Sequence, residues 1–179
     1  GMSSRKGGAV LVDEVLAEGA AAAEKILLSS RTCRLSPEEV KEASSEVALT
    51  ALRIEDLRRR RQANLNFSWR KALRLQSKRG EVYQTGFLLQ YRQARLTTRL
   101  QRVETELGLS SLEEASSEPL DFRDPEAIRL CQVMLRYPAA LAEAYEELQS
   151  KPLASFAFDL AAALGSATKR LKIIHSTVP

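Results

Sequence analysis

The most periodic part of the sequence is GFLLQYRQARLTTRLQRVETEL, residues 86–107. Its apolar side chains recur at intervals of seven, four, three and four residues, the spacing of one helix face: Leu89, Leu96, Leu100, Val103 and Leu107. Arginines recur on the adjoining face at intervals of three, four and three residues: Arg92, Arg95, Arg99 and Arg102. The segment therefore predicts a long helix that begins at Gly86, with buried leucines and a basic face beside them.

Helix signals also precede this segment. An apolar, alanine-rich stretch predicts a helix over residues 9–30, and Ser36-Pro37-Glu38-Glu39 predicts the next helix start, with a capping box between Ser36 and Glu39. We expect this second helix to run to about Arg61 and to break at residues 64–67. A short helix from Ser68 follows, and its neighbours Phe67 and Trp69 are expected in the core rather than as platforms for stacked bases.

Three proline-marked starts predict three more helices downstream. Asp124-Pro125-Glu126 begins the first, Pro138 ends it and begins the second, and Pro152 opens a last helix that continues through Ile174. Residues 110–122 are acidic and serine-rich, and we expect a loop there. Because strand signals are nearly absent, the predicted fold is all-α, a helical bundle of about six or seven helices.

The composition excludes several classes of function. The chain has 179 residues, 44% of them hydrophobic, which is enough to bury the core of one domain. Its cysteines, Cys33 and Cys131, are far apart and lack metal-ligand spacing, and His175 is its one histidine; a disulfide framework, a paired-cysteine metal site and histidine-based catalysis are therefore not expected. There is no apolar run long enough for a membrane span and no signal-peptide pattern, so we expect neither a span nor secretion. Gly1 before Met2 is interpreted as the remnant of a cleaved tag.

Charge is distributed unevenly along the chain. Residues 53–102 hold 14 basic and 3 acidic side chains, whereas the remaining residues hold 13 basic and 20 acidic ones. A basic middle of this kind indicates a surface that faces a polyanion, and a solvated basic face is the alternative that charge alone leaves open. The arginine stripe has no acidic residue between Glu81 and Glu104, and unpaired guanidinium groups suit phosphate.

Four segments resemble those of arginyl-tRNA synthetases. GFLLQYRQARL at residues 86–96 resembles the glycine, Leu-Gln-Tyr and Ala-Arg that open a long helix of the family's anticodon-binding domain. ALRIEDL at residues 51–57 looks like the Ala-Leu-x-x-x-Asp-Leu segment, and FSWRKAL at residues 67–73 resembles a Phe-x-Trp/Phe-Asp block, with Arg70 in place of the frequent Asp. FAFDLA at residues 156–161 is similar to Tyr-x-x-Asp-Leu-Ala. The spacing is most similar to that of the mitochondrial-type animal enzymes.

The opening segment resembles the end of the synthetase catalytic domain, in a loop that contacts ATP phosphates in class I synthetases. The ATP-loop-like residues are Met2, Ser3, Ser4, Arg5, Lys6 and Gly7. The resemblance implies that residues 1–35 are the tail of the catalytic domain and that residues 36–179 are an α-helical anticodon-binding domain. That domain is expected to be C-terminally truncated, because the family continues beyond this point. The family's aromatic cluster after Leu160 is replaced here by Leu164, Ala167 and Thr168.

The resemblance implies a binding function. Arginines would neutralise phosphates of the tRNA anticodon arm, and neighbouring polar and aromatic groups would read unstacked bases. The candidate tRNA-binding residues are Arg58, Arg59, Arg60, Arg61, Gln90, Tyr91, Arg92, Arg95, Arg99 and Arg102. No catalytic residue, metal ligand or cofactor is expected in this chain, whereas the parent enzyme uses ATP.

The resemblance also implies partners and a location. The expected partners are tRNA(Arg) and the catalytic domain of the same enzyme, without a membrane, and the oligomeric state is left open. The expected compartment is the mitochondrial matrix, with the cytoplasm as the alternative. The alternative function is a helical protein-interaction module, derived from the synthetase, that no longer binds tRNA.

Overall fold

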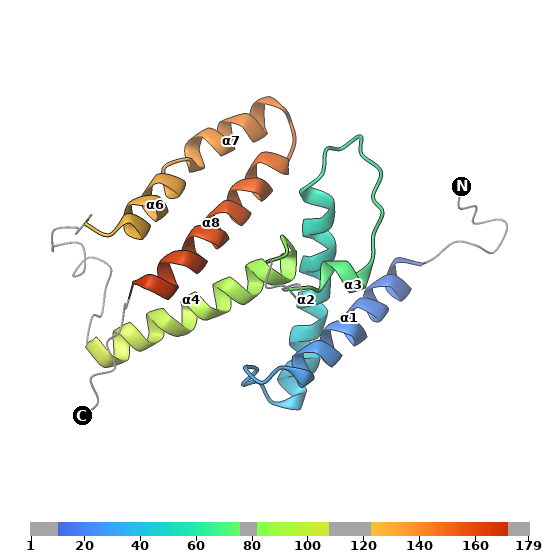
Figure 1. Cartoon of the computed structure of the whole chain (residues 1–179). Helices are drawn as coiled ribbons and strands as arrows, with labels where there is room; N and C mark the ends of the chain where they lie inside the picture. The colour runs from blue at the N-terminus through green and yellow to red at the C-terminus, as the bar shows by residue number, and fades with distance from the viewer. Residues whose placement is uncertain (1–10, 76–81, 108–122, 172–179) are drawn as a thin grey trace. The chain divides into compact units, whose positions relative to one another are not determined.

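The computed structural model describes residues 11–75, 82–107 and 123–171, and the expectations for residues 1–10, 110–122 and beyond 171 lie outside these ranges. Every helix or strand that it assigns within them is an α-helix (Figure 1), which confirms the all-α prediction. The helices are α1 (Val12–Ser29), α2 (Pro37–Leu57), α3 (Trp69–Ala72), α4 (Gly86–Leu107), α6 (Pro125–Met134), α7 (Tyr137–Glu146) and α8 (Lys151–Arg170).

The chain divides into two compact units. The N-terminal unit comprises Gly1–Asp56 and Asn64–Phe87, and the C-terminal unit comprises Leu57–Ala63 and Leu88–Pro179. The N-terminal unit therefore holds α1, most of α2, α3 and the first two residues of α4. The C-terminal unit holds the rest of α4 together with α6, α7 and α8.

Trp69 lies at the centre of the N-terminal core. It is 8% exposed and belongs to a buried cluster with alanines of α1 and α2 and with Phe87. Gly19 of α1 lies directly against the indole, where a Cβ atom would overlap the ring. Phe67 meets the same ring edge-on, with 4.7 Å between the ring centroids. Trp69 is a core residue, as the sequence predicts.

The start of α2 follows the predicted capping box. The Ser36 amide donates to Glu39 Oε2 at 2.7 Å, and the Glu39 amide donates to Ser36 Oγ at 3.3 Å, so two otherwise unpaired donors are satisfied. The predicted start of α6 is confirmed as well, because the Asp124 carboxylate accepts a bond of 2.7 Å from the Glu126 amide.

The end of α2 differs from the prediction. The helix stops at Leu57, and residues 58–61 lie in the turn that follows it rather than on the helix. The Leu57 carbonyl accepts a hydrogen bond of 2.9 Å from Ser150 Oγ, instead of the amide four residues ahead that a continued helix would supply. A partner distant in sequence thus satisfies the helix end.

In the C-terminal unit, α8 packs against α6 and α7 and also meets α4 (Figure 1). It does so through small side chains and one ring, with Ala154, Phe158, Ala161 and Gly165 buried at intervals of four, three and four residues. This spacing keeps one face of α8 toward its neighbours.

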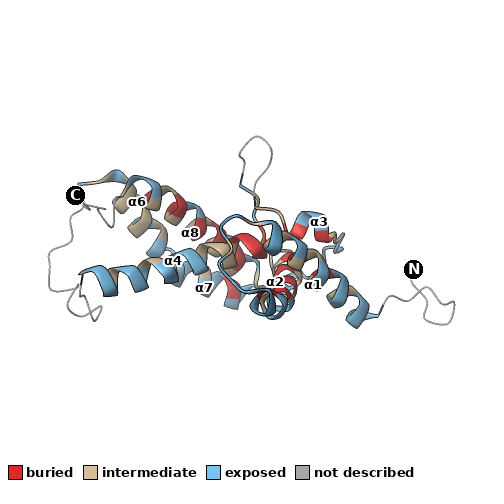
Figure 2. Ribbon diagram, turned by 90° about the horizontal axis from the view of Figure 1, so that it is seen from below, coloured by how far each residue is buried: buried red, intermediate tan, exposed pale blue. Residues whose placement is uncertain are grey.

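The predicted burial of the α4 leucines is wrong in part. The half-buried positions at intervals of three, four, three and four residues are Leu89, Arg92, Leu96, Arg99 and Val103, whereas Leu100 is 55% exposed. Figure 2 shows the second half of α4 as largely exposed. The reason is that α8 covers α4 on the side of Arg92, Leu96 and Arg99, and Leu100 lies at the edge of that side, where it stays exposed.

Candidate nucleic-acid interface

The arginines of α4 gather where α4 meets α8. Arg92, Arg95 and Arg99 line a small notch together with Leu96, and Leu164 and Thr168 close it from α8. The free volume of the notch is about 10 Å³, which accommodates about one water-sized atom. The notch thus fits a single oxygen atom and is far too small for a nucleobase.

Arg92 and Arg99 are the half-buried members of this group. The Arg92 Nε atom is buried and has no hydrogen-bond partner among the described residues. Burial lowers the pKa of Arg99, and the positive charges of Arg95, Arg92 and Arg102 lower it further. The notch is therefore a concentration of like charge that a bound anion would relieve.

Arg95 and Arg102 have partners on α4 itself. Arg95 Nη1 donates to the Tyr91 hydroxyl at 3.0 Å, and the Arg95 guanidinium carbon lies 5.7 Å from the centre of the Tyr91 ring. Arg102 Nε donates to Glu106 Oε1 at 2.8 Å. Both partners of that ion pair are substantially exposed, and exposed pairs contribute little free energy. A phosphate would compete with this weak pairing of Arg102.

Gln90 and Tyr91, the predicted base-reading residues, are half-buried on the same helix. Arg95 contacts both the hydroxyl and the ring of Tyr91. The structure therefore brings an arginine and an aromatic ring together, an arrangement that suits single-stranded RNA. The base-reading role of both residues stays a prediction.

The four-arginine run lies elsewhere in the C-terminal unit. The Arg58 guanidinium carbon lies 6.0 Å from the centre of the Phe158 ring of α8. Arg60 lines a groove of about 330 Å³ with the basic residues Arg136 and Lys151 and the acidic residues Glu143 and Glu147. The two predicted arginine groups thus border different hollows, and that of Arg60 has mixed charge.

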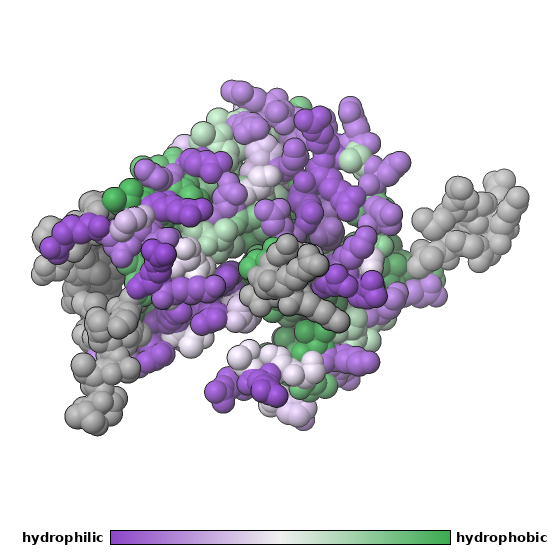
Figure 3. Space-filling view, in the orientation of Figure 1, coloured by the Kyte–Doolittle hydropathy of each residue, from purple (hydrophilic) through white to green (hydrophobic). Residues whose placement is uncertain are grey.

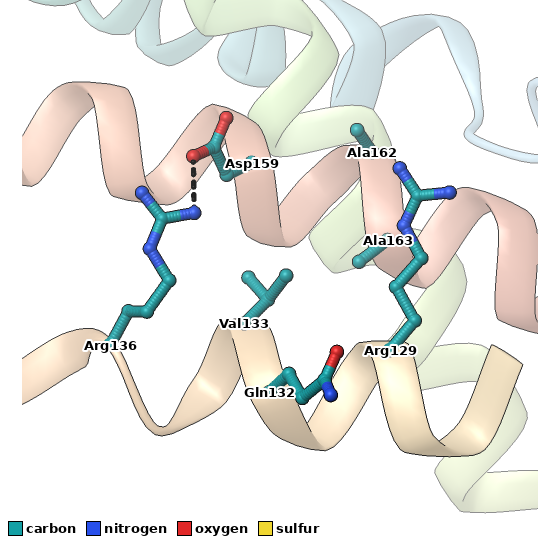
Figure 4. A pocket seen from close by; sticks show the side chains of 7 residues that line it. All are labelled: Arg129, Gln132, Val133, Arg136, Asp159, Ala162 and Ala163. Atoms are coloured by element: carbon teal, nitrogen blue, oxygen red, sulfur yellow. Dashed lines mark hydrogen bonds and ion pairs between the residues drawn. The ribbon is translucent and has the colours of Figure 1, made fainter. Parts of the chain in front are cut away.

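A further hollow, of about 380 Å³, lies between α6 and α8 (Figure 4). It was not predicted from the sequence. Arg129, Gln132 and Arg136 line one side of it, and Arg136 Nη1 donates to Asp159 Oδ2 at 3.0 Å. The intervals of three and four residues between these side chains could have revealed their shared face. Asp159 itself stands in the FAFDLA segment.

Hydrophobic side chains also reach the surface of this unit. Met134 and Leu135 are 55% and 79% exposed, and hydrophobic residues are visible over α6 in Figure 3. Several large apolar side chains of α7 and its C-terminal end are exposed in the same way: Tyr137, Leu141, Tyr145 and Leu148. Such exposure is typical of surfaces that contact another macromolecule.

Metal-binding clusters and membrane-spanning helices are both absent from residues 11–75, 82–107 and 123–171, the ranges that the structure describes. This part of the chain holds no cluster of three His, Cys, Asp or Glu side chains that could bind a metal ion. None of its helices combines the length and the apolar character that crossing a membrane requires.

The C-terminal unit is all-α and carries a basic face on α4, as the resemblance to the anticodon-binding domains of class I aminoacyl-tRNA synthetases implies. Residues 89–178 match the family model of the DALR anticodon binding domain, and the chain belongs to this family. Residues 1–69 match a second model, the catalytic domain of class I tRNA synthetases (R). The predicted boundary after residue 35 stays a prediction.

Curated relatives and a solved structure agree with this assignment. The chain is 25% identical to the mitochondrial arginine–tRNA ligase of Saccharomyces cerevisiae over 96% of its own length and 25% of the relative's. It is 28% identical to the probable cytoplasmic arginine–tRNA ligase of Dictyostelium discoideum over 97% and 27%. The chain thus spans about a quarter of the length of these relatives.

The solved structure is that of the Thermus thermophilus arginyl-tRNA synthetase. The two chains share 24% identity with a TM-score of 0.69, over 96% of this chain and 26% of that one. At this identity the likeness shows a common fold. Together with the family matches, it confirms the resemblance predicted from residues 86–96.

Proposed function

We propose that this chain binds the anticodon arm of tRNA(Arg) through the α4 and α8 face of its C-terminal unit. The observation that carries the proposal is the convergence of Arg92, Arg95 and Arg99 on one notch, within the segment that matches the DALR family. Guanidinium groups bind phosphate through paired, charge-assisted hydrogen bonds. Their crowding also favours an anion that neutralises them.

The arginines position the RNA, and other groups read it. Phosphate contacts fix register without distinguishing sequences, whereas stacking and hydrogen bonds to unstacked bases discriminate among them. Gln90 and Tyr91 lie beside the arginines and are the candidates for base reading. Arg58 and Arg60, on the turn after α2, would extend the phosphate-binding surface along the C-terminal unit.

The chemistry belongs to the partner domain. We expect attachment of arginine to tRNA(Arg) to occur in an ATP-dependent class I catalytic domain, to which residues 1–69 are related. The ATP-loop-like residues 2–7 lie outside the described ranges, and their contact with ATP stays a prediction. The mitochondrial matrix is the compartment we propose, with the cytoplasm as the alternative, because relatives from both match.

Salt-dependent tRNA binding tests the proposal. Filter binding of a tRNA(Arg) transcript, at about 50 and about 200 mM salt, measures the slope of log affinity against log salt. If three phosphates are engaged on the single-stranded loop, the slope should be about −2, from about −0.7 for each contact. The double variant Arg95→Gln/Arg99→Gln should flatten this slope by about 1.4 and weaken binding to all tRNAs similarly.

A charge-matched control separates the interface from net charge. Arg70 and Lys71 are exposed on α3 in the N-terminal unit, so Arg70→Gln/Lys71→Gln removes the same two charges and should leave the slope unchanged. A wild-type chain without salt-dependent affinity for tRNA would refute the proposal. That result would favour the protein-interaction alternative, for which the exposed apolar side chains of α6 and α7 would supply the surface.

A further inference from the structure

The guanidinium of Arg92 lies against the main chain of α8 at Gly165. A Cβ atom at position 165 would be 2.6 Å from Arg92 Nη2, 2.8 Å from Cζ and 3.2 Å from Nη1. Two of these distances are shorter than van der Waals contact allows, so a larger residue would displace the guanidinium. Only glycine leaves room for the arginine in its present place.

Helix stability does not account for Gly165. The residue is buried in the interior of α8, where glycine is less favourable than any residue except proline. A glycine in such a position is explained by the close approach of another group. Here that group is a cation from α4.

The same cation lacks a partner on its buried side. Arg92 Nε has no hydrogen bond among the described residues, and an unsatisfied buried donor is costly, the more so when it carries charge. Arg95 and Arg99 border the same notch, and Thr168 lies across from them on α8. Three guanidinium groups thus border the notch, and Arg92 Nε has no acceptor among the described residues.

The size of the notch limits what can supply that acceptor. A volume of about 10 Å³ holds one oxygen atom, and a ring that stacks or pairs by its edge would need many times more room. A phosphate offers one oxygen to the notch beside Arg92, and Arg95 and Arg99 on its rim remain available to the neighbouring phosphates. Bidentate guanidinium binding suits this geometry.

We infer that the notch between α4 and α8 binds one backbone phosphate of the RNA and that Gly165 is the positioning residue that keeps the Arg92 guanidinium in it. The inference rests on the proposed tRNA-binding function and deepens it. It assigns a binding role to a residue without a polar side chain. It also divides the three arginines of the notch into Arg92, which lies against Gly165, and two rim residues, Arg95 and Arg99.

The variant Gly165→Ala tests this directly. Alanine is the better helix former, and the end of the Arg92 side chain is free to swing outward, so the melting temperature should be unchanged or higher. The affinity for tRNA(Arg) should nevertheless fall about fivefold at about 0.1 M salt, the factor for one phosphate contact with an exponent of about 0.7. The salt slope should become less negative by about 0.7.

A double-variant cycle shows whether Gly165 acts through Arg92. Arg92→Gln alone should produce the same loss of affinity and slope, and Gly165→Ala should add little in the Arg92→Gln background. Arg70→Gln removes one charge from an exposed site on α3 in the N-terminal unit and serves as the charge control, with an unchanged slope. Equal losses for Gly165→Ala in both backgrounds would overturn the positioning role.

The other possible results distinguish failure of this inference from failure of the proposed function. If the wild-type chain binds tRNA and Gly165→Ala binds as well as it does, the inference fails while the proposed function stands. If the wild-type chain shows no salt-dependent binding, both fail. Should Gly165→Ala lower the melting temperature, Arg92→Gln alone decides the phosphate site: a slope reduced by about 0.7 for every tRNA supports it, and an unchanged slope overturns it.

Discussion

Replacement of Gly86 by alanine should destabilise the N-terminal unit. Gly86 begins α4 where that helix touches the main chain of α2, and its Cβ would lie 2.7 Å from the Thr50 carbonyl oxygen and 3.0 Å from Ala51 Cα. Ala51 is 0% exposed within the core cluster around Trp69. Because these neighbours are main-chain atoms of a packed helix, neither can move without opening the core.

The magnitude follows from two opposed effects. Overpacking of this kind costs about 1–3 kcal/mol, and the helix preference of alanine over glycine returns at most about 1 kcal/mol. A net loss of about 1–2 kcal/mol lowers the melting temperature by about 2–8 °C for a chain of this length. Thermal unfolding followed by circular dichroism measures it. The matched control is Gly165→Ala, where the new methyl group meets a movable side chain; if Gly86→Ala melts at the wild-type temperature, the close contact with α2 is not a constraint.

Three other predictions concern stability and activity. Leu96→Ala should lower the free energy of unfolding by about 1–2 kcal/mol because Leu96 is half-buried, whereas Leu100→Ala should change it by less than about 0.5 kcal/mol; equal losses in denaturant titrations would contradict the orientation of α4. Hydrogen bonds from Ser36 lower the pKa of Glu39 from its usual 4.5, so Glu39 stabilises the fold above that pH and the effect disappears as the pH falls through the lowered pKa. Glu39→Gln should remove this part of the acid sensitivity, and a melting profile between pH 3 and 6 that matches the wild type would refute it. The purified 179-residue chain should show no arginine-dependent exchange of pyrophosphate into ATP, and any exchange above background would contradict the binding-only function.

Sequence reasoning succeeded where structure is decided locally. The capping box of Ser36 and Glu39 and the Asp124 cap are built from residues within three positions of each other, so their pattern alone predicts the helix starts. The range of α4 was predicted for the same reason, because its periodicity lies within one segment. Both helix caps and the range of α4 can therefore be predicted from a short stretch of sequence alone.

The sequence did not predict the features that depend on residues far away along the chain. The end of α2 depends on Ser150, which is 93 positions away from Leu57, and no local pattern shows that partner. The buried side of α4 depends likewise on Gly165, whose missing side chain lets Arg92 approach α8. A leucine-rich stripe predicts which face is apolar, but the neighbour that covers a face is set by tertiary packing.

One signal for the notch was present in the sequence. Gly165 interrupts an otherwise alanine- and leucine-rich helix, and a glycine at such a position indicates a close approach by another group. Its partner could not be named without the structure. The arginines of α4 were recognised as a basic face, but nothing in their spacing distinguished Arg92, which lies against α8, from Arg95, which remains exposed.

The crowding of arginines around the notch implies that binding and stability oppose each other at Arg99. Burial and the charges of Arg95, Arg92 and Arg102 all lower the pKa of Arg99, which means that folding disfavours its protonated form. At neutral pH the charge therefore destabilises the free chain. Arg99→Gln should melt at or above the wild-type temperature, and added sodium chloride should raise the wild-type melting temperature more than that of the variant, because salt screens the repulsion.

When RNA is bound, the positive charge of Arg99 becomes favourable, because it attracts the phosphate at the notch. The same charge destabilises the free protein. Arg99→Gln should therefore weaken tRNA binding and reduce the salt slope by about 0.7, although the free variant is at least as stable as the wild type. Arg70→Gln, on α3 of the N-terminal unit and outside the cluster, should change neither the melting temperature nor the affinity for tRNA. If Arg99→Gln lowers the melting temperature and the affinity together, Arg99 is a structural residue of the α4–α8 contact, and its positive charge is not held there for an anion.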